Sequence, residues 1–357
     1  MILMKGLKFL FLNVLFLVSF LFFANRVFAD ENSSFTGIVT QVLKTEDKYQ
    51  LLEVAITKGE RKNQLIYVEN GGYDIADYQE YKKNNKLLIS YSKDPEGNDV
   101  YLIADYVRQD MLMTIFVIFM VVSILVTGAW GISSLLGMGF SFLIILKVLL
   151  PLIIRGCDPV LAAIGSSLLI IPASFYLSHG FNKKTHIAIV GTLISLIITG
   201  LLSSFFISKS KLTGFSSEEA GFLFFEKQEV NMLGVLLAGI IIGTLGVLDD
   251  VTVSQSAVVF QLKSLNNKLK PKELYLRAMK VGKDHIASMI NTLFLVYAGA
   301  SMPLLLLFVN NPKSISEVVN YEPIAEEIIR TLVGSIGLIL AIPITTILAV
   351  FHAVKKK

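Results

Sequence analysis

Residues 239–261 read GIIIGTLGVLDDVTVSQSAVVFQ, and this stretch decides the fold class. In a helix, where each residue turns the chain by about 100°, Gly239, Gly243, Gly246 and Asp250 fall on one narrow face. An acidic side chain in hydrocarbon costs about 2.5 to 3.5 kcal/mol, so a chain that carries one usually shields, pairs or uses it. The stretch therefore predicts a membrane helix that presents a carboxylate to a bundle interior along a groove of helix-packing glycines.

The composition supports a membrane protein. Hydrophobic residues make up 54% of the 357 residues, charged residues make up 17%, and the mean hydropathy is +0.65. Such a chain is too apolar for a water-soluble globule, so its main partner is the lipid bilayer. The net charge of +4 is explained by basic loops and predicts no nucleic-acid partner. Cys157 is the only cysteine, which excludes an intramolecular disulfide.

The N-terminus has the features of a secretory signal. Lys5 and Lys8 precede an apolar stretch that runs to Phe23, and small and apolar residues lead to Ala29. This pattern predicts a signal peptide at residues 1–29, cleaved after Ala29. The alternative is an uncleaved anchor helix. Both interpretations predict that the following segment is exported.

Residues 30–108 differ in character from the rest of the chain. They are polar and rich in Lys, Glu, Tyr and Asn, and they contain no His or Cys. Short alternating stretches predict five half-buried strands, which lie at residues 35–43, 49–57, 64–68, 87–91 and 100–107. We expect a small exported β-barrel-like domain, similar to an OB-fold, that acts as a spacer or docking module rather than as a metal or hydrolytic site.

Residues 109–352 hold apolar runs long enough to cross a bilayer, which needs about 20 helical residues. The fold class predicted is thus an α-helical polytopic membrane protein. We expect seven transmembrane helices, at residues 111–128, 132–154, 159–178, 186–207, 231–249, 285–309 and 329–351. Residues 353–357 form a basic tail.

The distribution of cations predicts the orientation. With the first span entering from outside, the inner segments hold twelve Lys and Arg residues and the outer loops hold six. The positive-inside rule then places the N-terminal domain outside the cytoplasm and the C-terminus in the cytoplasm, with the chain in the plasma membrane.

Two stretches carry the candidate transport or ion-path residues. The first, residues 239–261, contains Asp249, Asp250 and Ser254. The second, residues 282–303, reads GKDHIASMINTLFLVYAGASMP and places further polar side chains within about 100° of one another, with Gly299 on the same side. These are Asp284, Ser288, Asn291 and Thr292. The alternatives are that Asp284 caps a helix that begins at Gly282 and that Asn291 and Thr292 bond neighbouring helices.

The sequence leaves open where Asp249 and Asp250 lie relative to the membrane. A straight helix over residues 231–262 would be about 48 Å long, against a hydrocarbon thickness of about 30 Å. Either the helix emerges near Asp249, or it starts later and holds the acids in mid-membrane. A break at Gly246 would instead produce a re-entrant segment.

One further pattern predicts close helix packing. Gly191, Ser195, Thr199 and Ser203 follow one another at four-residue spacing in the fourth predicted span. Small side chains at this spacing allow two helix backbones to approach.

The segments GTLGVLDDVTVSQSA, at residues 243–257, and residues 282–303 together resemble the YibE/F-like family of multi-pass bacterial membrane proteins, over residues 110–352. GSIGLILAIPITT, at residues 334–346, resembles the family's ending. The matching positions are Gly243, Gly246, Asp250, Val251, Ser254, Gly282, Asp284, Asn291, Thr292, Gly299 and Pro303. Asp249 departs from the pattern, which usually has an apolar residue there. The resemblance implies membership, topology and a transport label.

The leading functional hypothesis is a permease for a small solute or ion, coupled to protons or a cation through Asp250 or Asp284. The alternative is a non-transporting accessory or sensor whose exported domain binds a membrane protein partner or a second copy. An enzyme is not expected. A Gly-Xaa-Gly-Asp protease motif is absent because Val247 and Leu248 precede the acids, and the four histidines lack the pairing that a metal site needs, so no cofactor is expected.

Overall fold

The structure, a computed structural model, describes residues 34–59, 61–71, 78–227, 229–309 and 314–354. The chain forms two compact units, Met1–Gly128 and Ala129–Lys357, and each is described by itself. The predicted signal peptide at residues 1–29 lies outside the described residues.

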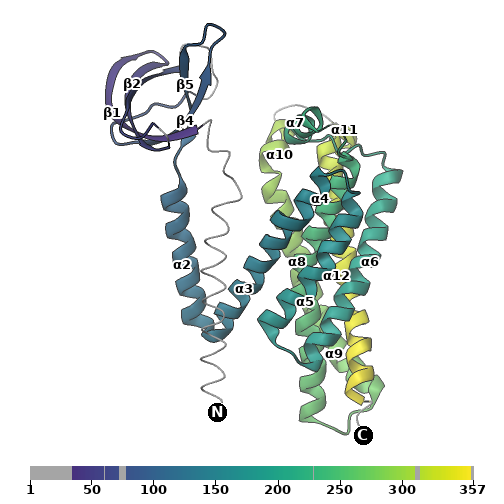
Figure 1. The fold of residues 1–357 in the computed structure, drawn as a ribbon. Coiled ribbons are helices and arrows are strands. Elements are labelled where there is room, and N and C mark those ends of the chain that lie inside the picture. The colour runs from purple at the N-terminus through teal and green to yellow at the C-terminus, as the bar shows by residue number, and fades with distance from the viewer. Residues whose placement is uncertain (1–33, 60, 72–77, 228, 310–313, 355–357) are drawn as a thin grey trace. The chain divides into compact units, whose positions relative to one another are not determined.

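The N-terminal unit contains the five predicted strands: β1 (Ser34–Glu46), β2 (Tyr49–Lys58), β3 (Leu65–Gly71), β4 (Lys86–Lys93) and β5 (Asp99–Tyr106). They form one antiparallel sheet in the order β3-β2-β1-β4-β5. Because β3 and β5 also approach each other, the sheet is nearly closed (Figure 1). The predicted small barrel-like β domain is confirmed as a nearly closed antiparallel sheet.

Alternation along the strands fills the barrel. Val39 of β1, Leu52 and Val54 of β2, and Leu87 and Ile89 of β4 are fully buried at every second position. Shifts of register between β1 and β2 add the curvature that a small barrel needs. The strand period and these bulges thus give the unit its own hydrophobic core.

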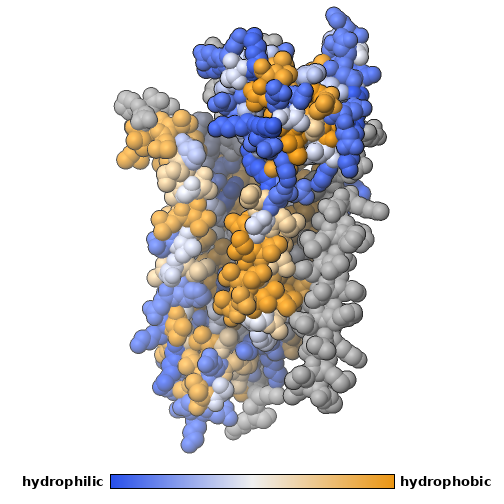
Figure 2. Space-filling model, turned by 90° about the vertical axis from the view of Figure 1, so that its left-hand side faces the viewer, coloured by the Kyte–Doolittle hydropathy of each residue, from blue (hydrophilic) through white to orange (hydrophobic). Residues whose placement is uncertain are grey.

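A single apolar helix, α2 (Gln109–Thr127), ends this unit. None of its described residues is buried, although its mean hydropathy of 2.4 exceeds that of the other candidate spans. Figure 2 shows hydrophilic side chains over the sheet and a band of hydrophobic side chains on the helix that follows it. Such an exposed apolar helix is suited to lipid.

The second unit is a helical bundle (Figure 1). Its long helices are α3 (Ala129–Ile144), α5 (Pro159–His179), α6 (Lys183–Lys209), α8 (Met232–Leu265), α9 (Pro271–Ala300) and α12 (Glu322–Val354). The π-helical segment η1 (Ile145–Leu149) and α4 (Leu150–Ile154) continue α3, and α10 (Met302–Val309) follows α9 at a bend of 69°. Two shorter helices, α7 (Glu218–Glu226) and α11 (Ile315–Asn320), lie at one end of the bundle.

The number of candidate membrane spans among the described helices agrees with the expected seven when a bent pair is counted as one span. Six are long and apolar enough to cross a membrane, or seven if α9 and α10 count as one bent span. Local capping sets several of their ends. Asp158 accepts a hydrogen bond from the Leu161 amide at the start of α5, and Asn182 accepts one from the Thr185 amide at the start of α6.

The predicted stripe of small residues on α6 does pack closely, against α12. Ser195, Thr199 and Ser203 are fully buried. A Cβ at Gly191 would overlap the Thr345 side chain, and a Cβ at Gly337 would overlap the Thr199 side chain. The backbones of α6 and α12 can approach this closely because Gly191 and Gly337 have no side chain.

The structure excludes two of the alternatives that the sequence left open. Helix α8 runs without a break through Gly246, Asp249 and Asp250, so no re-entrant segment forms there. Helix α9 begins at Pro271 and not at Gly282, so Asp284 lies inside the helix and caps nothing. Gly282 is buried beside Gln255 and Ile342, and this tertiary packing outweighs the weak helix propensity of glycine.

Candidate functional site

The two adjacent acids of α8 lie in different environments. Successive helical residues point about 100° apart, so Asp249 and Asp250 cannot face the same neighbours. The Asp250 side chain is exposed. One carboxyl oxygen of Asp249, Oδ1, is buried and has no hydrogen-bond partner among the described residues. A buried acceptor without a partner is costly, which marks Asp249 as a functional candidate.

Asp249 lines a polar pocket between α3, α5 and α8. The pocket has a volume of about 270 Å³. Four serines line it together with the aspartate: Ser134, Ser141, Ser174 and Ser178. The remaining wall is apolar, with Met138, Ile145, Ile170, Phe175, Ile242, Leu245 and Gly246.

Helical spacing explains why these serines meet. Ser134 and Ser141 are seven residues apart on α3, and Ser174 and Ser178 are four residues apart on α5. Both spacings place side chains on one face of a helix. Both α3 and α8 pack against α5, and this packing brings the three faces together. The spacing of these serines is visible in the sequence, but the predicted site does not include them.

The pocket adjoins a local irregularity of the second span. Ile145, which lines the pocket, is the first residue of the π-helical segment η1. Single turns of π-helix are rare and occur frequently at functional sites, because the extra residue redirects side chains and backbone carbonyls. The irregularity thus coincides with the polar pocket.

The other sequence-predicted polar residues do not line this pocket. Asp284, Ser288, Asn291 and Thr292 are exposed on α9. Ser254 is partly buried on α8, and its hydroxyl lies 3.4 Å from Nδ1 of His285. The structure therefore brings α8 and α9 side by side, as the two motifs suggested, but leaves most of their polar side chains on the surface of the chain.

The predicted packing role of four glycines stays a prediction, and three of them make no close contact within the described chain. Gly239, Gly246 and Gly299 are exposed, and a Cβ on any of them would meet nothing within 4 Å. Gly243 is also exposed, and a Cβ there would lie 4.0 Å from the Tyr297 hydroxyl. The reason is that α8 turns its opposite face inward, where Leu248, Val251 and Thr252 are fully buried.

The inward polar side chains of α8 beyond Asp249 are bonded to neighbouring helices. Thr252 shares a hydrogen bond of 2.7 Å with Thr192 of α6. Gln255 donates to the Thr346 hydroxyl at 2.8 Å and to the Ala278 carbonyl at 3.1 Å. These bonds hold α6, α8, α9 and α12 together, and they contrast with the unpartnered oxygen of Asp249.

The acids near the start of α12 tie down a loop. Glu322 accepts hydrogen bonds from the amide and the hydroxyl of Thr213, and Glu326 accepts one from Ser216 at 2.6 Å. Arg330 forms an ion pair of 3.1 Å with Glu327. This arrangement fixes the connection between α6 and α8 on the end of α12.

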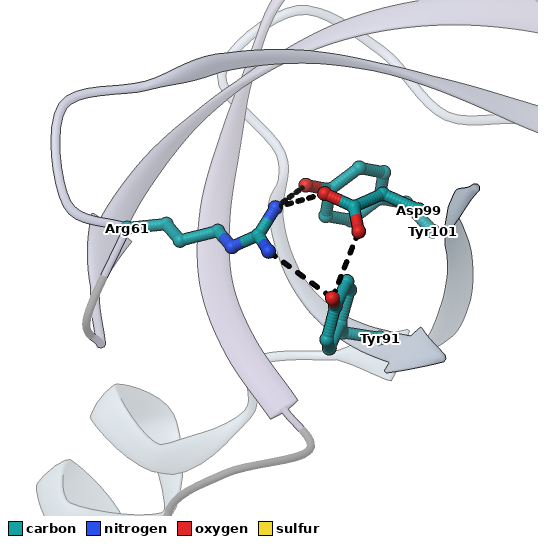
Figure 3. Close-up of polar contacts among 4 residues, drawn as sticks. All are labelled: Arg61, Tyr91, Asp99 and Tyr101. Atoms are coloured by element: carbon teal, nitrogen blue, oxygen red, sulfur yellow. Dashed lines mark hydrogen bonds and ion pairs between the residues drawn. The ribbon is translucent and has the colours of Figure 1, made fainter. Parts of the chain in front are cut away.

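A cluster in the N-terminal unit is also structural (Figure 3). Arg61, in the β2–β3 loop, donates to Asp99 at 2.5 Å, to Tyr91 at 3.1 Å and to Tyr101. Tyr91 donates to Asp99 at 2.8 Å. The bond from Arg61 and then that from Tyr91 lower the pKa of Asp99. Because the four side chains satisfy one another, the cluster closes the barrel between the β2–β3 loop and β5.

The family model for YibE/F-like proteins matches residues 115–355. The chain belongs to the YibE/F-like family. The match covers α3 to α12 and most of α2, so it includes every residue of the Asp249 pocket. The resemblance expected from the glycine–aspartate and asparagine motifs of this YibE/F-like protein is thereby confirmed. Comparisons with curated proteins and with solved structures gave no match.

Proposed function

We propose that this YibE/F-like protein is a permease that moves a small solute or ion across the plasma membrane and uses the Asp249 pocket as a polar station. One observation carries the proposal: Asp249, whose buried oxygen Oδ1 has no partner among the described residues, lines a pocket together with four serines, between helices able to span a membrane. Ionisable side chains inside membrane segments commonly mark substrate paths or proton relays.

Asp249 replaces Asp250 and Asp284 as the preferred residue in this proposal. All three are carboxylates, but Asp250 and Asp284 are exposed on the surface of the chain. Asp249 instead lines a pocket, and the pocket's serines supply further oxygen atoms for a bound species.

The proposed orientation follows from the cations. Lys183 and Lys184 start α6, and the connection between α8 and α9 holds Lys268 and Lys270. Under the positive-inside rule these ends face the cytoplasm, and the N-terminal unit lies outside. The Asp249 pocket would then open nearer to the cytoplasmic end, because Ser178 lies in the last turn of α5.

Flux into proteoliposomes tests the function. The purified full chain would be reconstituted and assayed for uptake of protons, Na⁺, K⁺ and a panel of small organic solutes. We expect flux of at least one species above that of empty vesicles, and a loss of about tenfold or more in Asp249→Asn, which corresponds to about 1.4 kcal/mol. Glu218→Gln, which neutralises an exposed carboxylate on α7, is the charge-matched control.

Two outcomes would contradict the proposal. Parent vesicles that match empty vesicles for the whole panel would favour the accessory hypothesis, in which the N-terminal unit binds a partner. Full flux in Asp249→Asn would remove the pocket from the path. A selective loss in Asp250→Asn would instead return the role to the residue that the sequence singled out.

A further inference from the structure

Two of the four serines that line the Asp249 pocket use their hydroxyl protons within their own helices. The Ser141 hydroxyl donates its proton to the Gly137 carbonyl at 2.9 Å, and the Ser174 hydroxyl donates to the Ile171 carbonyl at 3.4 Å. A serine whose proton is used in its own helix has only lone pairs left for other groups. An ionised carboxylate also only accepts. The lining therefore favours a ligand that is a cation or a strong donor.

The charge of the lining sets the charge of the ligand. Among the residues that the structure describes, Asp249 is the only charged one that lines the pocket, and no Lys, Arg or His lines it. One carboxylate balances a single positive charge. Calcium takes about six to eight oxygen ligands, usually with several carboxylates among them, and magnesium needs near-ideal octahedral geometry. A single carboxylate therefore suits a monovalent cation better than either divalent ion. Among the described residues, no group of three or more His, Cys, Asp or Glu is placed to hold a metal ion.

The size of the pocket sets the size of the ligand. A volume of about 270 Å³ has room for several water molecules, since a cavity needs only about 10 to 15 Å³ to hold one. An alkali cation with part of its hydration shell fits this space, and so does a small primary ammonium ion. The ring of Phe175, which lines the pocket, offers a further surface that attracts cations.

We propose that the Asp249 pocket binds a monovalent cation, with the Asp249 carboxylate as its counter-charge and serine hydroxyl oxygens as additional ligands. The inference rests on the proposed function, because it names the species that the polar station takes. The cation is either an inorganic ion such as Na⁺ or K⁺ or the ammonium group of a small amine. Asp249 then has its missing partner in the bound state.

Thermal unfolding of the purified full chain in detergent tests binding without any transport. The melting temperature would be measured in increasing NaCl, KCl or methylammonium chloride, with N-methylglucamine chloride holding the ionic strength constant. We expect a saturable rise of about 2 to 4 °C or more with at least one of the three salts, since binding to the folded state stabilises it. The responding salt separates an alkali ion from an amine.

Variants connect the shift to the pocket. Asp249→Asn should abolish it, and Ser141→Ala should raise the half-saturating concentration severalfold. Glu218→Gln should behave as the parent. If Asp249→Asn fails to fold, Ser141→Ala and direct binding of radioactive Na⁺ or of Rb⁺, as a K⁺ analogue, decide the question. Competition by the responding salt should displace the radioactive ion.

The proposal is overturned if no monovalent salt exceeds the N-methylglucamine control, if CaCl₂ or MgCl₂ saturates at lower concentration than all three, or if Asp249→Asn keeps the full shift. Cation binding without flux would support the cation site and contradict the permease proposal. Flux that depends on Asp249, without any effect of the cations on the melting temperature, would support the permease proposal and contradict the cation site.

Discussion

Asp249 and Asp250 are consecutive residues of α8, yet Asp249 lines a serine-rich pocket while Asp250 is exposed. Sequence motifs favoured Asp250 because it aligns with three glycines. In the structure that aligned face is on the outside of the chain. The residue that departs from the family pattern is therefore the one that lines the pocket.

Neutralising Asp249 and neutralising Asp250 should affect the stability of the folded protein differently. Asp249→Asn should raise the free energy of unfolding by about 1 to 3 kcal/mol when no Na⁺ or K⁺ is present, because it removes a buried negative charge that has no partner among the described residues. Asp250→Asn should stay within about 0.5 kcal/mol of the parent. Thermal unfolding in detergent measures both. A lower melting temperature for Asp249→Asn would mean that this carboxylate already has a partner.

The contact between Gly337 and Thr199 gives the second prediction. Gly337→Ala should destabilise the bundle by about 1 to 3 kcal/mol, since its Cβ would overlap the Thr199 side chain. The double variant with Thr199→Ala should recover part of the loss. Gly239→Ala is the control, because a Cβ there meets nothing within 4 Å. Equal stability of Gly337→Ala and Gly239→Ala would refute close packing of α6 on α12.

Cys157 allows a direct test of orientation. It is exposed and is the only cysteine, so a membrane-impermeant maleimide should label the parent protein on intact cells. Cys157→Ser should remove the label. Ser264→Cys in that background, at the exposed end of α8, should react only after permeabilisation. Labelling in the opposite order would invert the proposed topology.

The Arg61–Asp99 pair predicts acid sensitivity of the barrel. The folded-state pKa of Asp99 lies below its unfolded value of about 3.9, so its stabilising effect is present above that value and is lost as the pH falls through the folded pKa. In a fragment of residues 30–108, Asp99→Asn should lower the urea midpoint at neutral pH. It should also weaken the decline in stability below about pH 4.

Asp47→Asn is the matched control for that experiment, because Asp47 is an exposed aspartate in the β1–β2 turn. It should keep both the neutral midpoint and the acid decline of the parent fragment. An acid decline that Asp99→Asn leaves unchanged would show that other carboxylates govern the pH dependence.

The sequence by itself determined which segments of this protein form strands and which form membrane helices. Hydropathy located the membrane spans, period-two alternation located the five strands, and four-residue spacing identified the close face of α6. These features depend on local periodicity and on transfer from water to lipid, which act residue by residue. The family motifs were equally visible, because they are contiguous in the chain.

Only the tertiary structure decided which face of each helix points inward. A hydrophobic helix in lipid carries little information about its own rotation, since both bilayer and bundle accept apolar side chains. The direction of α8 follows instead from bonds made far along the chain, such as Thr252 to Thr192 and Gln255 to Thr346. Those bonds turn Asp249 toward the serines of α3 and α5 and leave Asp250 outside.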